Sequence, residues 1–122
     1  MRVLGIMLAL LIILTGYTLS FADDIQPKGL KAVAGNNVVY LSWSKPDKAV
    51  QGYWVYRAIP EGEYQRINTV LLKKNFYKDT AVANGQLYWY TVTAVDVEDN
   101  ENAQSENVSA TPYIRKGSII GY

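Results

Sequence analysis

The sequence predicts an all-β protein, a seven-stranded antiparallel sandwich. The first observation is a set of short runs rich in aromatic and β-branched residues, which favour the pleated, half-buried surface of a strand. The second is that clusters of Gly, Asn, Asp and Pro separate these runs at fairly regular intervals, as turns do. The third is that no segment repeats apolar residues at the spacing of a helix. Together these patterns are typical of two packed antiparallel sheets.

The first half of the chain contains three predicted strands, at 29–34, 38–43 and 52–58. Residues 35–37 are Gly-Asn-Asn and form a turn, because Gly and Asn tolerate positive φ. Pro46 ends the second strand, since proline cannot donate to a sheet ladder. Strand alternation places Trp43 on an apolar face of the second strand, and Tyr53 and Val55 on one face of the third. We expect these three side chains in the core.

The second half contains four more predicted strands, at 64–67, 76–80, 87–97 and 106–112. Residues 60–63 and 83–85 carry turn-forming residues, and residues 98–105 form a polar loop. The connection at 68–75 carries three apolar residues that we expect to pack into the core, Val70, Leu71 and Leu72.

The run at 87–97 is the longest of these strands, and we expect the others to pack around it. Successive side chains on a strand point to opposite faces. Tyr88, Tyr90 and Val92 therefore share one face, which we expect to be buried, and Trp89 points to the other.

Several sequence patterns of this chain occur in the same order in a known protein family. They are Trp43 on the second strand, the third-strand sequence Gly52-Tyr53-Trp54-Val55-Tyr56-Arg57, the approach Asp79-Thr80 with Val82, Gly85 and Tyr88, and the runs at 90–96 and 105–112. Over residues 27–112 the sequence resembles a fibronectin type III domain of the bacterial secreted type.

This resemblance implies an immunoglobulin-like sandwich that acts as a non-catalytic binding or spacer module. It implies that Trp43 is buried and that Tyr88 is the tyrosine corner, whose hydroxyl bonds to nearby backbone. The sequence departs from the family at two positions. Asn84 stands where proline is common, and Asp99 stands where glycine is frequent.

The chain divides into four parts. Residues 1–22 have a positive start, an apolar run and small residues before Asp23, which predicts a signal peptide cleaved after Ala22. An uncleaved membrane anchor is the alternative, although the apolar run is short for a span. Residues 23–28 form a predicted linker, residues 29–112 the domain and residues 113–122 a tail, whose apolar end could cover a sheet, join a partner or fray.

Composition excludes several classes of function. The 122 residues include neither cysteine nor histidine, which removes thiolate chemistry and the commonest general base and metal ligand. The net charge is +1, so nucleic-acid binding is disfavoured. We predict no enzyme activity, no cofactor and no membrane contact once the leader is removed.

Charges are nevertheless segregated along the chain. Basic residues gather in the middle, at Arg57, Arg66, Lys73, Lys74 and Lys78, and acidic residues gather at 96–106. The acidic loop offers many oxygens, as calcium requires, but its spacing does not match an EF-hand. We therefore expect a solvated loop, and a calcium site remains the alternative.

Aromatic residues supply the candidate binding face. If Tyr53 and Tyr88 face inward, alternation places Trp54, Tyr56 and Trp89 outside. The resemblance makes their strands neighbours, so these three would share one face. Exposed aromatic clusters often mark binding surfaces. Two alternatives are that the cluster only stabilises the sheet, or that the apolar tail covers it.

These observations favour an exported, non-catalytic module that binds another protein, or itself, through this face or a sheet edge. The alternative is a carbohydrate-binding accessory module in which Trp54, Tyr56 and Trp89 stack on sugar rings. A purely structural spacer is a third possibility. The expected partner is a protein or a polysaccharide, and the expected location is secreted, periplasmic or at the cell surface; the oligomeric state stays open.

Overall fold

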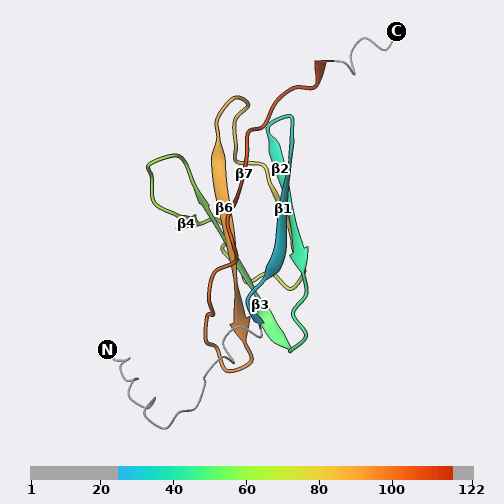
Figure 1. Ribbon diagram of the computed structural model, residues 1–122, viewed down its shortest axis with the longest axis vertical. Helices are drawn as coiled ribbons and strands as arrows, with labels where there is room; N and C mark the ends of the chain where they lie inside the picture. Colours follow the sequence, from blue (N-terminus) through green and yellow to red (C-terminus); the bar gives the residue numbers. More distant parts are fainter. Residues whose placement is uncertain (1–24, 117–122) are drawn as a thin grey trace.

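The computed structural model describes residues 25–116 as two antiparallel sheets packed face to face (Figure 1). The three-stranded sheet has the order β1-β2-β5, with β1 at Lys28–Gly35, β2 at Val38–Ser44 and β5 at Phe76–Asp79. The four-stranded sheet has the order β4-β3-β6-β7, with β4 at Gln65–Arg66, β3 at Val50–Ala58, β6 at Tyr88–Asp96 and β7 at Val108–Ala110. The predicted fold class is confirmed. The predicted signal peptide at 1–22 and the end of the predicted tail lie outside the described residues.

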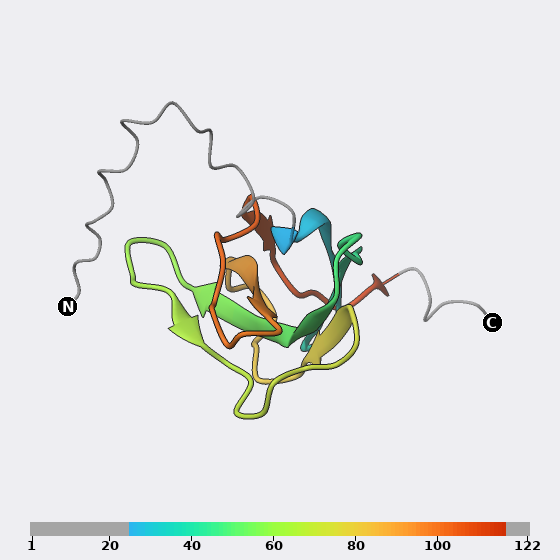
Figure 2. The same cartoon turned by 90° about the horizontal axis from the view of Figure 1, so that it is seen from below.

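The two edges of the four-stranded sheet are short. Seen from below, β4 lies on the side of the molecule away from β1 (Figure 2). The last strand, expected over 106–112, pairs regularly only at Val108–Ala110. The chain before it still runs beside β6, where the backbone N–H groups of Asn102 and Ser105 each donate to β6 carbonyls over 2.8 Å. This stretch is irregular because the Ser105 hydroxyl also accepts a hydrogen bond from β6, donated by the Val92 N–H group.

The edge strand β1 is interrupted near its start. Its pairing with β2 shifts register between Lys28 and Lys31. Gly29 lies there with a φ of 67°, a left-handed conformation that glycine adopts without steric cost. The result is a β-bulge at the free edge of the three-stranded sheet.

The core lies between the sheets and includes all six side chains predicted for it, which are Trp43, Tyr53, Val55, Tyr88, Tyr90 and Val92. The Trp43 and Tyr53 rings meet edge to face, with centroids 5.2 Å apart. Ile25 and Pro27 are also buried, so the segment predicted to be a linker at 23–28 contributes packing.

The expectation that Val70 packs into the core is wrong, because Val70 is 72% exposed. Leu72 instead pairs with Tyr53 through two backbone hydrogen bonds and packs partly against the core. The buried side chain in this connection is Asn68. Its amide accepts from the Val55 N–H group over 2.7 Å and donates to the Tyr53 carbonyl over 3.1 Å. One polar side chain thus completes the β3 ladder where β4 stops.

Two features fix the loop that leads into β6. The Ala83 N–H group donates to the Tyr88 hydroxyl over 2.9 Å, which is the tyrosine corner expected from the resemblance. Asn84 also exchanges hydrogen bonds with the β1–β2 turn, accepting from the Asn37 N–H group and donating to the Asn36 side chain. The asparagine that departs from the family pattern therefore ties two loops together.

A buried carboxylate joins the two sheets. Asp79, on β5, accepts hydrogen bonds from Arg57 on β3 over 2.9 Å and from the Tyr90 hydroxyl on β6 over 2.8 Å. Burial and the bond to Asp79 raise the pKa of Tyr90 far above its ordinary value. Burial also raises the pKa of Tyr53 and of Tyr77.

The substitution Tyr88→Phe removes the hydroxyl and leaves the Ala83 N–H group without its partner. We expect it to lower the free energy of unfolding by about 1–3 kcal/mol, as loss of a buried hydrogen-bond partner does. Urea denaturation measures this value. Tyr40→Phe is the matched control, because Tyr40 is exposed, and its effect should stay within about 0.5 kcal/mol. Equal effects of the two variants would contradict the tyrosine corner.

Alkaline pH should destabilise the protein through its buried tyrosines. In the unfolded chain a tyrosine loses its proton near pH 10, whereas the raised pKa of Tyr90 keeps the folded state protonated. The unfolded state then binds fewer protons, so stability is full below pH 10 and falls above it. Each such tyrosine adds up to about 1.4 kcal/mol per pH unit to this fall. Urea denaturation at pH 8–11 should show a smaller slope for Tyr90→Phe, and an unchanged slope would refute the assignment.

Candidate functional site

The three aromatic residues of the candidate binding face lie on the outer side of the four-stranded sheet. Trp54 and Tyr56 project from β3, Trp89 projects from β6, and each is half-buried. In the β3–β6 register Trp54 is opposite Thr93, Tyr56 is opposite Thr91, and Trp89 is opposite Ala58. Trp54 and Trp89 therefore sit at opposite ends of the face, four positions apart along β3, with Tyr56 between them.

Arg66 covers part of this face. It stands opposite Tyr56 on β4, and its guanidinium carbon lies 3.9 Å from the centroid of the Trp54 ring. The same group is 5.7 Å from the Tyr56 ring centroid. Stacking of this kind attracts the cation to the electron-rich ring. The outer surface of Trp54 is thus already occupied by a neighbouring side chain.

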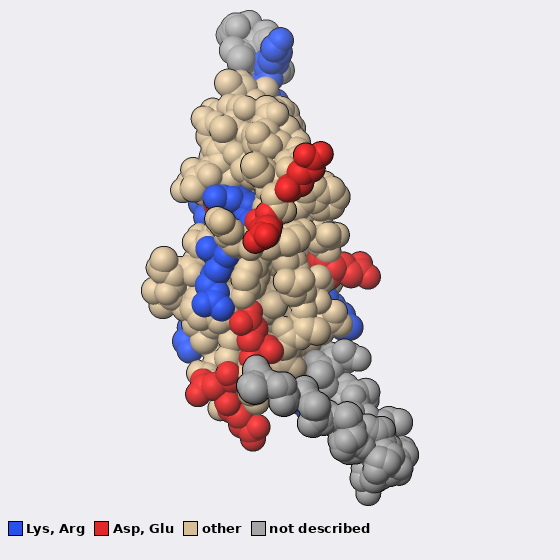
Figure 3. All heavy atoms as spheres, turned by 90° about the vertical axis from the view of Figure 1, so that its left-hand side faces the viewer, with Lys and Arg blue, Asp and Glu red and all other residues tan. Residues whose placement is uncertain are grey.

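Glu101 completes the network. Its carboxylate accepts one hydrogen bond from the Tyr56 hydroxyl and another from the Thr93 hydroxyl over 2.6 Å. It also forms an ion pair with Arg66 at 3.3 Å. The side of the molecule that carries β4 shows a basic and an acidic group in contact (Figure 3). Burial, followed by the bond to Glu101, raises the pKa of Tyr56. Charge and hydroxyl groups on this face are satisfied by one another.

The acidic loop is organised by its own backbone. The Asp96 carboxylate accepts from the N–H groups of Glu98 and Asn100 over 2.8 and 2.9 Å. The N–H group of Asn100 contributes most to lowering the pKa of Asp96. Asp99 adopts a φ of 70°, in the region that the glycine common at this position would favour. Within residues 25–116 no three acidic side chains gather as they would around a metal ion.

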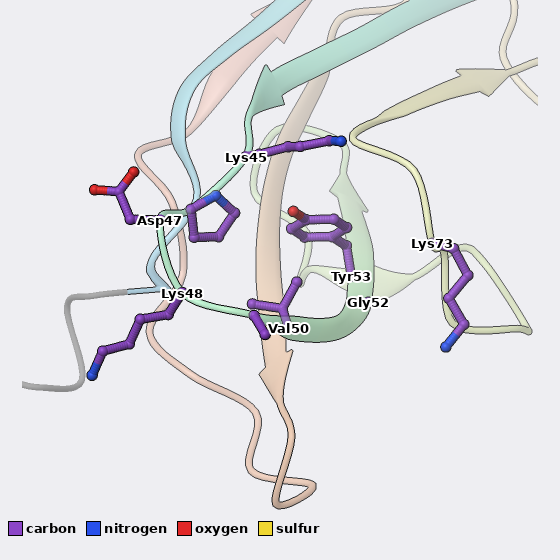
Figure 4. Close-up of a pocket in the computed structure, with 9 residues that line it drawn as sticks. Lys45, Asp47, Lys48, Val50, Gly52, Tyr53 and Lys73 are labelled. Carbon is purple, nitrogen blue, oxygen red and sulfur yellow. The ribbon is translucent and has the colours of Figure 1, made fainter.

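A hollow of about 430 Å³ lies at the β2–β3 connection (Figure 4). Lys45, Lys48 and Lys73 stand around it, with Tyr53 at its base. In Figure 4 the ammonium groups of Lys48 and Lys73 point away from Tyr53 on opposite sides. Lys73 donates to the Gln51 carbonyl over 2.9 Å. The cations therefore do not converge on one position, and the hollow lacks the geometry of an anion site.

The chain beyond β7 follows the other sheet. The Tyr113 N–H group donates to the Gly35 carbonyl over 3.0 Å, which places the start of the predicted tail beside the end of β1. The more apolar residues 117–122 lie outside the described residues. None of the segments in 25–116 is a helix of the length and hydrophobicity needed to cross a membrane.

Comparison with solved structures places this sandwich in a family. A crystallised Fn3-like protein from Clostridium thermocellum is 31% identical with a TM-score of 0.62, over 74% of this chain and 92% of that protein. The chain belongs to the fibronectin type III family. The domain is also similar to part of a β-1,2-glucanase from Parabacteroides distasonis, at 30% identity and a TM-score of 0.66, over 76% of this chain and 13% of that one. No family model matches the sequence.

Sequence comparison adds relatives of much greater length. The chain is 46% identical over 105 residues to an amylopullulanase of Thermoanaerobacter thermohydrosulfuricus, which covers 85% of this chain. It is 40% identical over 87 residues to an amylopullulanase of Thermoanaerobacterium saccharolyticum, which covers 70% of this chain. The domain spans 7% of the length of each of these proteins. It is therefore homologous to one segment of large amylopullulanases.

Sequence reasoning found the three aromatic residues of the face but missed Arg66 and Glu101, which cover and bond them. The missing information is the register of β4 against β3 and the return path of the acidic loop. Neither follows from alternation within a single strand. Predicting that Arg66 lies beside Tyr56 would have required the path of the β3–β4 connection, which the sequence does not give.

Removing Arg66 should expose Trp54. We expect Arg66→Ala to increase acrylamide quenching of tryptophan fluorescence, because Trp43 is buried and contributes little, while Trp54 loses its cover. The lost cation–π contact should lower stability by about 0.5–1 kcal/mol. Lys78→Ala, on the other sheet, is the control and should leave the quenching unchanged. Identical quenching of Arg66→Ala and wild-type protein would show that the guanidinium does not shield Trp54 in solution.

Proposed function

We propose that this fibronectin type III domain is an exported, non-catalytic accessory module that works through contacts with protein. The observation that carries the proposal is the closure of the aromatic face. Arg66 lies over Trp54, and Glu101 accepts a hydrogen bond from the Tyr56 hydroxyl, so two of the three groups that would stack on or bond to a sugar are engaged within the domain. The cost of breaking these contacts would oppose binding of a glycan there.

Two further observations support an accessory role. The relatives are amylopullulanases in which this domain is one small segment. The chain has neither histidine nor cysteine, and the carboxylates of Asp96 and Glu101 are held in structural hydrogen bonds. The leader-like composition of residues 1–22 supports export.

A carbohydrate-binding accessory module is the second candidate. It is favoured by the names of the relatives and by the half-exposed position of Trp89, which Arg66 does not cover. A single aromatic platform would give weak binding, since each stacking contact contributes little by itself.

Affinity electrophoresis in gels that contain pullulan or amylose tests the two candidates. We expect no retardation of the wild-type domain relative to a gel without glucan, and no release of reducing ends from either glucan. Retardation that Trp89→Ala abolishes, with Tyr113→Ala as the exposed-aromatic control, would replace the proposed function by the second candidate. Release of reducing ends by the purified chain would refute the non-catalytic role.

A further inference from the structure

The outer side of the three-stranded sheet differs from that of the four-stranded one. It presents three large apolar side chains to solvent, with exposed fractions of 61% for Val33, 47% for Tyr40 and 54% for Phe76. Three exposed lysines share this side, Lys31, Lys74 and Lys78. We call these six residues the lysine-rich face.

The strand register makes this face continuous. Val33 on β1 pairs with Tyr40 on β2, which pairs with Lys78 on β5. In the next outward row Lys31 pairs with Ser42, and Ser42 pairs with Phe76. The Lys78 ammonium lies 5.9 Å from the Tyr40 ring centroid, and that of Lys74 lies 5.3 Å from the Phe76 ring centroid. Apolar and cationic groups thus alternate on one flat surface.

These charges have no counter-charge on their own sheet. The outward positions of β1, β2 and β5 carry no carboxylate, because the acidic residue of β5, Asp79, points into the core. Among the ion pairs of residues 25–116, none involves Lys31, Lys74 or Lys78. On the other sheet, by contrast, Arg66 is paired with Glu101. The lysine-rich face therefore suits an apolar partner surface that carries carboxylates.

The chain itself contains a surface of that kind. Val97 is 66% exposed at the tip of the loop after β6, and its neighbours are Asp96, Glu98 and Asp99. The Asp99 N–H group donates to the Asp96 carbonyl over 3.1 Å, so the tip is held in a defined shape. Hydrogen bonds from the N–H groups of Asn100 and Glu98 lower the pKa of Asp96 and hold the loop around that carboxylate. We call residues 96–99 the acidic tip.

We propose that the lysine-rich face of one molecule binds the acidic tip of a second copy. This inference rests on the proposed function, for which it names the protein partner. Val97 would pack on Tyr40 and Phe76. The exposed Glu98 carboxylate would meet the lysines, because those of Asp96 and Asp99 already accept hydrogen bonds within the domain. Within one molecule the tip lies at the lower end of the sandwich and the face lies along its flank (Figure 1), so the contact joins two different surfaces.

A contact between unlike surfaces is heterologous, and repeated use of it builds rings or open chains. The contact of a loop tip with a sheet is small, so the association should be of the weak class. Because the charges are exposed, salt should weaken it further. We expect reversible self-association at high protein concentration. We expect 1 M NaCl to suppress it, because the screening length falls to roughly 3 Å at that salt concentration.

Sedimentation velocity over a concentration series of the full chain tests the proposal. The face variant is Tyr40→Ser with Phe76→Ser, and the tip variant is Val97→Ser with Glu98→Lys. Each should weaken self-association at least about tenfold. An equimolar mixture of the two variants should form a dimer and nothing larger, because only one intact face and one intact tip remain per pair.

Val70→Ser is the matched control, since Val70 is exposed but belongs to neither surface; it should associate like the wild-type chain. Circular dichroism establishes that every variant is folded. A wild-type chain that stays monomeric at every concentration in low salt would overturn the inference, and so would a variant mixture that stays monomeric. Neither result bears on the glucan experiment, which decides the proposed function separately.

Discussion

The antiparallel pairing of β3 with β6 is the constraint on which the rest of the structure depends. Its register runs from Val50 opposite Asp96 to Ala58 opposite Trp89. Because side chains alternate across a strand, this pairing sends Tyr53 and Tyr90 into the core and Trp54 and Trp89 outward. A slip by one residue would exchange the two faces of the strand and expose the core set. Burial of the inward set therefore also fixes the composition of the outward face.

Much of this arrangement could be predicted from the sequence, because it depends on local alternation and on turn residues. The seven strands and the apolar face that carries Trp43 follow from such patterns, whereas the Tyr88 corner was implied by the resemblance to fibronectin type III domains. The contacts made by long-range neighbours could not be predicted in this way. Asn68 was missed because a polar residue in a connection gives no sign that it will complete a ladder. Val70 was misplaced because the apolar character of a residue in a connection does not fix the direction of its side chain. Arg66 and Glu101 reach the aromatic face only through the tertiary fold.

The two outer faces show how similar composition can lead to different surfaces. Both carry aromatic residues and basic side chains. On the four-stranded sheet the cation is neutralised by Glu101 and stacked on Trp54, whereas on the three-stranded sheet Lys78 lies over Tyr40 and Lys74 lies over Phe76. An inventory of exposed residue types would rank the tryptophan-bearing face first. The bonding within each face argues for the opposite order, because Arg66, Tyr56 and Glu101 of the four-stranded face are engaged with one another.

The bulge at Gly29 bears on whether strands of other molecules can add to the β1 edge. The free edge of a sheet presents unpaired backbone groups that can template the addition of strands from other molecules. A bulge twists that edge and breaks its regular spacing, so the β1 edge is a poor template for amyloid-like growth. For a domain with no cysteine, and hence no disulfide to hold it closed, this protection resides in the backbone itself. Backbone geometry therefore disfavours irreversible sheet extension at this edge.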